Sequence, residues 1–139
     1  MIVNAAHLDK LRKAYPRLFM EEGMPWGFDH GDGWNLIIES LCDRIDSILK
    51  EVPEASVTIR QVKEKMGTLR FYYRLQGVDS EREQAIQAAV AAAYAVSEQT
   101  CEQCGSPGVL QETGRGLKTL CIACGGDNSH LVIAYTHTE

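Results

Sequence analysis

Two Cys-x-x-Cys pairs near the C-terminus constrain the fold of this chain more than any other feature. Cys101 and Cys104 form the first pair, Cys121 and Cys124 form the second, and sixteen residues separate them. Two thiolates three positions apart can bind one ion from a single tight turn, and a second such turn completes a tetrahedral set. The pattern therefore predicts a structural Zn²⁺ ion held by all four cysteines, with no coordination position left for a substrate.

The residues around these pairs fit a zinc ribbon. Residues 109–112 and 117–120 can pair as strands across a turn at 113–116, and residues 131–135 can add a third strand. Gly105 and Gly125 follow the two pairs, where tight turns often need unhindered backbone. Because so short a unit buries little apolar surface, metal binding should supply folding free energy of order 10 kcal/mol.

Other interpretations of the cysteines are a redox dithiol pair or unrelated buried thiols. Zinc is favoured, because a thioredoxin-type motif would not occur twice at this spacing. His130 and His137 could be additional ligands, but four cysteines already suffice. The fifth cysteine, Cys42, falls in a predicted helix where a small apolar residue fits, and the sequence indicates no histidine beside it to make it a nucleophile.

The composition is that of a globular chain with room for one domain and a small appendage. Of the 139 residues, 45% are hydrophobic and 24% are charged, which excludes a disordered or fibrous protein. No apolar stretch approaches the roughly 18 residues that span a membrane, and residues 1–15 lack the apolar core of a secretory signal. We therefore expect a cytoplasmic protein with reduced thiols and no membrane contact.

Hydrophobic spacing predicts three helices and a hairpin before the cysteines. The expected elements are a helix from an Asn4 cap to about Tyr15, a loop over 20–33, a helix from an Asp32 cap to about Val52, strands at 55–63 and 68–75 joined by 64–67, and a helix from a Ser80–Glu83 capping box to about Glu98. We predict an α+β fold in which residues 1–100 pack helices on the hairpin and residues 101–139 form the zinc ribbon.

The glycine-rich loop before the second helix carries aromatic and polar side chains. Trp26, Phe28 and Trp34 are interpreted as a plug that packs the loop onto the helix, with an exposed anchor for a partner as the alternative. Asp29, His30 and Asp32 could share a metal or a proton, but neighbouring loop polar groups and a helix cap explain them as well.

Charge is unevenly distributed along the chain. The net charge of −5 gives no general attraction to nucleic acid, yet residues 31–54 carry net −4 and residues 55–79 carry net +3. Arg70, Tyr72 and Arg74 share one face of the second strand, a pattern that fits a single-strand nucleic-acid platform. The alternative is a solvated face whose arginines pair with acidic side chains. The predicted partner-binding residues are Asp43, Asp46, Glu51, Arg60, Arg70 and Arg74.

No catalytic motif is present: the chain has no P-loop, G-x-S-x-G, H-E-x-x-H or dinucleotide fingerprint. The third predicted helix has alanine at seven of the eleven positions 85–95, which leaves a small-residue surface suited to a homodimer. A hidden enzyme built on the loop carboxylates and histidine is the third hypothesis, behind two binding functions.

Several stretches, taken in order, resemble a largely uncharacterised family of small bacteriophage and prophage proteins. They are HLDKLRKAYPRLF (7–19), GDGW (31–34), QVKEKMGTLRFYY (61–73), TCEQCGSPG (100–108) and TLC (119–121). The resemblance covers most of the chain and implies no catalytic residues, because the family has no established activity. What it implies is a phage setting, in which small acidic proteins such as anti-CRISPR proteins often act by occupying a host protein.

We therefore expect a phage-encoded, non-enzymatic protein that inhibits a host defence complex of protein or nucleoprotein by direct contact. The rival hypothesis is a zinc-ribbon regulator that binds nucleic acid, with a steep dependence on salt. Its contacts would come from Arg60, Arg70, Arg74, Arg115 and Lys118.

Overall fold

The structure, a computed structural model, describes residues 5–19, 28–126 and 129–132. Its elements, with η for a 3-10 turn, are α1 (Ala5–Ala14), η1 (Pro16–Phe19), β1 (Phe28–Asp29), η2 (Asp32–Trp34), α2 (Asn35–Ile48), β2 (Ser56–Lys65), β3 (Thr68–Gln76), α3 (Ser80–Ser97), β4 (Val109–Thr113), β5 (Gly116–Leu120), α4 (Ile122–Gly125) and β6 (His130–Leu131). This mixture of helices and mainly antiparallel strands confirms the predicted α+β class.

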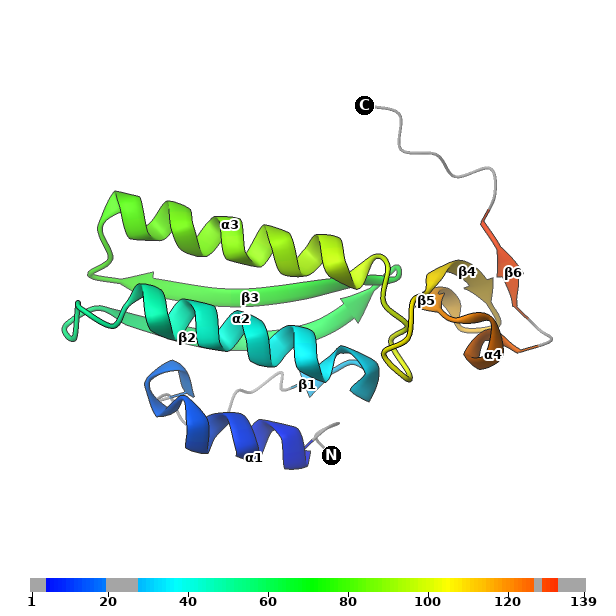
Figure 1. The fold of residues 1–139 in the computed structure, drawn as a ribbon, viewed down its shortest axis with the longest axis horizontal. Helices are drawn as coiled ribbons and strands as arrows, with labels where there is room; N and C mark the ends of the chain where they lie inside the picture. The colour runs from blue at the N-terminus through cyan, green and yellow to red at the C-terminus, as the bar shows by residue number, and fades with distance from the viewer. Residues whose placement is uncertain (1–4, 20–27, 127–128, 133–139) are drawn as a thin grey trace.

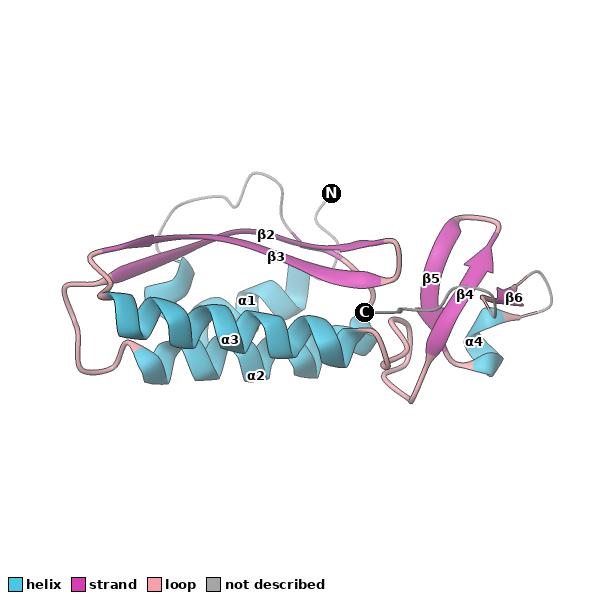
Figure 2. Ribbon diagram, turned by 90° about the horizontal axis from the view of Figure 1, so that it is seen from above, coloured by secondary structure: helices cyan, strands magenta, loops and turns pink. Residues whose placement is uncertain are grey.

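Two small sheets organise the chain. The first has the order β1-β2-β3, in which β2 and β3 form an antiparallel hairpin and β1 runs parallel to β2. Helices α2 and α3 run side by side along one face of this sheet (Figures 1 and 2). The second sheet has the order β5-β4-β6 and lies beyond the C-terminal end of α3. We call residues 5–99 the body and residues 100–132 the C-terminal unit.

The core of the body lies between the helices and the first sheet. Side chains from α1, η1, β1, α2, both hairpin strands and α3 form one buried apolar cluster. The fully buried members include Trp34, Ile38, Cys42, Ile45, Leu49, Val62 and Ile86. Burial of each large side chain contributes roughly 1.5–3 kcal/mol, so this cluster is the main source of stability of the body.

The second helix differs from the prediction at both ends. Asp32 does not cap it: Asp32 opens the 3-10 turn η2, its side chain is exposed, and α2 begins at Asn35. The helix ends at Ile48, because the chain leaves helical geometry at Leu49 and forms a turn in which the Val52 amide donates to the Leu49 carbonyl.

The hairpin is longer than predicted and its turn is tighter. Only Met66 and Gly67 form the turn, both with positive φ (53° and 81°), as in a type I′ turn. A bulge at Arg60 shifts the alternation in β2, so that the inward positions are Val57, Ile59 and then Val62.

The third helix runs from Ser80 to Ser97, close to the predicted range, but its cap lies one residue earlier than predicted. The Asp79 side chain accepts a hydrogen bond from the Arg82 amide (3.2 Å), whereas Ser80 is already helical. The predicted first cap, Asn4, lies outside the described residues. None of the helices in the described ranges combines the length and apolarity needed to cross a membrane.

Candidate metal centre

The four C-terminal cysteines converge on one point of the C-terminal unit. Cys101 and Cys104 lie on the turn that follows α3, Cys121 immediately follows β5, and Cys124 lies in α4. Their sulfur atoms all lie within 4.8 Å of one another, so the predicted cysteine cluster is present. Cys101 is buried, Cys121 and Cys124 are half-buried, and Cys104 is exposed.

The spacing of the sulfurs fits a single metal ion. A tetrahedral ion with metal–sulfur bonds of about 2.3 Å places its sulfur ligands roughly 3.8 Å apart. The Cys104 and Cys121 sulfurs are 3.7 Å apart, and all five cysteines are free thiols, not disulfides. Because four protein sulfurs fill a tetrahedral site, the arrangement is compatible with a structural metal ion.

Backbone hydrogen bonds shape both cysteine turns. In the first, the Cys101 carbonyl accepts from the Gly105 amide (2.9 Å), and Gly105 takes a positive φ of 84° where the sequence predicts a tight turn. In the second, the Cys121 sulfur accepts from the Cys124 amide (3.4 Å). There the positive φ falls on Gly126 (71°) and not on Gly125.

Gln111 holds the second cysteine turn in place, and sequence reasoning missed it. Its buried amide nitrogen donates to the carbonyls of Leu120 (2.7 Å) and Cys121 (3.3 Å), and its side-chain oxygen accepts from the Ser129 hydroxyl. A Cβ on Gly125 would lie 2.2 Å from this same oxygen, which explains the glycine there. An inward-facing polar residue on β4 is the signal that could have indicated this role.

The pKa values of two thiols in the cluster are shifted in opposite directions. Hydrogen bonds, first from the Ser106 side chain, lower the pKa of Cys104 to about 6, whereas hydrogen bonds to Cys121 and Cys104 raise the pKa of Cys124 to about 12. A crowded set of thiols gives up its first proton easily and its last with difficulty, and a divalent cation favours the fully ionised set.

The C-terminal unit is bonded to the loop before α2. The Gly33 amide donates to the Glu102 carbonyl (2.7 Å), and the Gly31 amide donates to the Glu102 carboxylate (2.9 Å). The Trp34 indole nitrogen donates to the Thr100 carbonyl (2.9 Å). These contacts join residues about 70 positions apart in sequence, beside the first cysteine turn.

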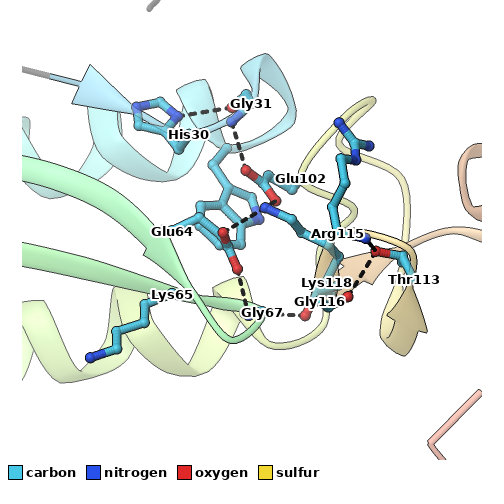
Figure 3. A network of polar contacts seen from close by, with 12 residues as sticks. His30, Gly31, Glu64, Lys65, Gly67, Glu102, Thr113, Arg115, Gly116 and Lys118 are labelled. Atoms are coloured by element: carbon cyan, nitrogen blue, oxygen red, sulfur yellow. Dashed lines mark hydrogen bonds and ion pairs between the residues drawn. The ribbon is translucent and has the colours of Figure 1, made fainter.

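A second group of contacts joins the hairpin turn to β5 (Figure 3). Lys118 lies 2.6 Å from the Glu64 carboxylate and 4.0 Å from that of Glu102, while the Thr119 hydroxyl donates to the Gly67 carbonyl (2.6 Å). Burial raises the pKa of Glu102, and the nearby Lys118 ammonium opposes that shift. Lys118, a predicted nucleic-acid contact, is thus engaged in an internal ion pair, and its side chain is only 22% exposed.

The loop residues before α2 have structural positions. Phe28 and Trp34 are buried, as predicted for a plug, while Trp26 lies outside the described residues. His30 is buried between their rings (5.3 and 6.5 Å between centroids), and its Nδ1 lies 2.9 Å from the Gly31 carbonyl. Asp29 and Asp32 are exposed, and within the described residues the group that could hold a metal ion is formed by the four cysteines and not by these three side chains.

The predicted charged residues occupy two separate surfaces. Asp43 and Asp46 lie on α2, Glu51 lies in the turn after it, and Asp43 accepts from the Tyr15 hydroxyl (3.2 Å). Among the described residues, no ion pair joins Arg70 or Arg74 to these three carboxylates. The arginines instead flank Tyr72 on the sheet face opposite the helices, which is the alternation the sequence predicts.

The remaining candidates lie apart from the metal centre. Cys42 is buried in the core, where burial raises the pKa of its thiol to about 12. His130 is exposed on β6 and is not a member of the cysteine cluster, and His137 lies outside the described residues.

Comparisons with known proteins add no family to this description. No protein-family model matches the chain, and neither a curated protein nor a solved structure matches it significantly. The resemblance to phage and prophage proteins therefore stays a prediction from the sequence motifs.

Proposed function

We propose that the protein is a phage-encoded, non-enzymatic binding protein of the anti-CRISPR type. It would inhibit a host defence complex by protein–protein contact. In this proposal the C-terminal unit is a zinc ribbon that serves as scaffold. The observation that carries the proposal is the closed sulfur set: all four donors come from the chain, which leaves no coordination position for a substrate.

Zinc is the proposed ion because of the donor chemistry. Four thiolates within 4.8 Å of one another suit a tetrahedral ion with soft ligands, and Zn²⁺ is the common occupant of such sites in small ribbons. When bound, the ion would hold the two cysteine turns together, while Gln111 orients the second of them.

An exposed tyrosine flanked by two arginines supports a contact function. Tyr72 is 46% exposed between Arg70 and Arg74 on the sheet face. Tyrosine and arginine are enriched among the residues that dominate the energies of protein interfaces. The resemblance of the sequence to phage proteins supports a host protein as the partner.

A plasmid-interference assay tests this proposal. The protein is expressed in strains that each carry one active CRISPR–Cas type, and survival of a targeted plasmid is counted. We expect one type to lose interference, and we expect Tyr72→Ala with Arg74→Glu to restore it. Lys13→Glu, at an exposed position of α1 outside the predicted contact residues, serves as the matched surface control. Unchanged interference in every type would contradict the anti-CRISPR proposal.

A nucleic-acid-binding regulator is the second candidate, favoured by the alternation of Arg70, Tyr72 and Arg74 on one sheet face. It predicts gel shifts with single- or double-stranded probes that weaken steeply as salt rises. The absence of a shift at micromolar protein and low salt would remove it.

A further inference from the structure

The outer edge of β3 is a candidate docking site for another strand. In the described part of the chain, β3 pairs with β2 on one side, and the sheet order β1-β2-β3 leaves its other side at the edge. An edge strand of nine residues presents backbone donors and acceptors in a row, which is the template that strand addition uses.

The hairpin register shows which backbone groups face outward. Lys65 and Thr68 flank the two-residue turn and form a hydrogen-bonded pair, so the amides of Leu69, Phe71, Tyr73 and Leu75 point away from β2. The first of these confirms the direction, because the Leu69 amide donates to the Ser97 hydroxyl on α3 (3.0 Å). Phe71, Tyr73 and Leu75 continue this outward row.

Helix α3 runs beside this edge (Figures 1 and 2), and side chains of both elements line a groove there. The groove has a volume of about 390 Å³, and the side chains of Val90, Ala91 and Tyr94 form part of its helical wall. The hydrogen bond from Leu69 to Ser97 closes one end. An entering strand would therefore bond to β3 through its backbone and pack alternate apolar side chains against α3.

The charges beside the groove favour an entering strand with acidic side chains. Arg70 and Arg74 alternate along β3, and the Arg70 guanidinium lies 5.8 Å from the centre of the Tyr94 ring, which brings a positive charge to the mouth of the groove. Glu83 lies near Tyr73 at the other end, so the two arginines outnumber the acidic group. Side chains of an added strand that face Arg70 and Arg74 are favoured when they are acidic.

Like charges disfavour one arrangement in which a second copy of the chain would occupy this edge. A symmetric antiparallel pair centred on Tyr72 would place Arg70 of each copy directly opposite Arg74 of the other. Like charges at directly opposed positions destabilise a sheet. This register is therefore disfavoured for the homodimer predicted from the alanine-rich helix.

We propose that the outer edge of β3, together with α3, binds an extended peptide segment of a partner protein in which acidic and apolar residues alternate, by adding it to the sheet as a further strand. The proposal rests on the contact function proposed above, and it names the site and the chemistry of the partner.

Binding of two synthetic peptides to the metal-loaded full chain tests the proposal. One fluorescent hexapeptide alternates glutamate and valine, and the matched one alternates lysine and valine. We expect the fluorescence anisotropy of the glutamate peptide to rise to a plateau as protein is added, and the lysine peptide to bind at least about tenfold more weakly. In NMR spectra of the protein, we expect the largest amide chemical-shift changes at Phe71, Tyr73 and Leu75. Equal binding of both peptides, or shifts centred elsewhere, would overturn it.

Two sets of variants distinguish the contribution of backbone hydrogen bonds to peptide binding from the contribution of charge. Tyr73→Pro removes an outward amide without removing a bond to β2, so it should weaken binding about tenfold, whereas Tyr73→Thr keeps the amide and should bind. Loss of binding in both would overturn strand addition. If Tyr73→Pro does not fold, the double variant Arg70→Glu, Arg74→Glu provides the test. This variant should bind the lysine peptide more tightly than the glutamate peptide. An unchanged preference for the glutamate peptide contradicts the proposal.

Three further results would also count against it: no binding of either peptide, concentration-dependent dimerisation that protects these amides, and binding of single-stranded DNA at the same amides. Peptide binding and plasmid interference can fail separately. Interference that is lost while the peptide does not bind overturns this inference alone, and peptide binding without any effect on interference overturns the proposed function alone.

Discussion

Gly33 lies at the closest backbone approach between the body and the C-terminal unit. A Cβ at this position would lie 2.2 Å from the Cys101 carbonyl oxygen and 2.6 Å from that of Glu102. Backbone atoms cannot move aside as a flexible side chain can, so we expect Gly33→Ala to lower the free energy of unfolding by about 2–3 kcal/mol. Urea denaturation followed by tryptophan fluorescence measures this change.

Gly114 provides the matched control, because no atom of the described residues lies within 4 Å of the place a Cβ would take there, and its φ is not positive. Gly114→Ala should be neutral or slightly stabilising, by a few tenths of a kcal/mol. If both variants unfold at the same urea concentration, the close approach at Gly33 does not limit the packing of the two parts.

His30 gives the body a sensitivity to acid. Burial lowers its pKa from the ordinary value of 6.5, so the unfolded chain takes up a proton before the folded chain does. Stability should therefore fall as the pH is lowered from 7 to 5. His30→Phe should reduce this loss, measured as the difference between the urea midpoints at the two pH values. An equal loss in the variant would show that other groups cause it.

Single residues differ in how far the sequence predicts them. The four cysteines are predictable, because their spacing alone indicates two turns whose sulfur atoms can meet at one ion. Gln111 and Glu102 are not, because their roles depend on a strand register and on a loop that is distant in sequence. Lys118 shows the same limit, since a basic residue in a sequence carries no sign of the carboxylate it meets.

At the scale of an element, Asp79 and Ser80 are the two candidates for the N-terminal cap of α3. The Asp79 carboxylate accepts from the Arg82 amide and also forms an ion pair with the Arg82 guanidinium (2.9 Å). Asp79→Ala should therefore lower the melting temperature by a few degrees, because it removes a helix cap. Ser80→Ala, at the position the capping-box pattern predicts, should lower it much less. Thermal denaturation of both variants ranks them, and the reverse order would support the Ser80 cap.

The types of the elements follow from the sequence better than their ends do. Apolar periodicity predicts α2, α3 and the hairpin, because each needs one apolar face toward the same core. The ends depend on single hydrogen bonds, such as those that turn the chain after Ile48, and these leave little trace in composition. The bulge at Arg60 is equally local, and it changes which residues of β2 face inward.

For the whole molecule, several contacts cross the division at residue 100 that the sequence predicts. Gly31, Gly33 and Trp34 all bond to the chain at 100–102, and the hairpin turn bonds to β5. Such contacts couple the two parts energetically, because loss of structure in one leaves buried donors of the other without acceptors. No local sequence pattern predicts this coupling, since it arises only when distant segments meet.

Removal of the metal ion should therefore destabilise the body as well as the C-terminal unit. We expect about one zinc ion per chain in fresh, reduced protein, and a strong chelator should lower the melting temperature by roughly 10 °C. Trp34, whose indole donates to Thr100, places a fluorescent reporter at the junction. Cys121→Ser should reproduce the effect without chelator, while Cys42→Ala, away from the cluster, should keep the ion.

The shape of the unfolding transition decides between coupled and independent parts. If the ion stabilises both, fluorescence and circular dichroism follow a single transition that shifts as a whole when the ion is removed. If chelation instead melts the C-terminal unit and leaves the transition of the body unchanged, the contacts of Glu102 and Lys118 contribute little and residues 1–100 behave as a separate domain. The first outcome is expected, because the Gly33 amide and the Trp34 indole both lose their acceptors when residues 100–102 detach.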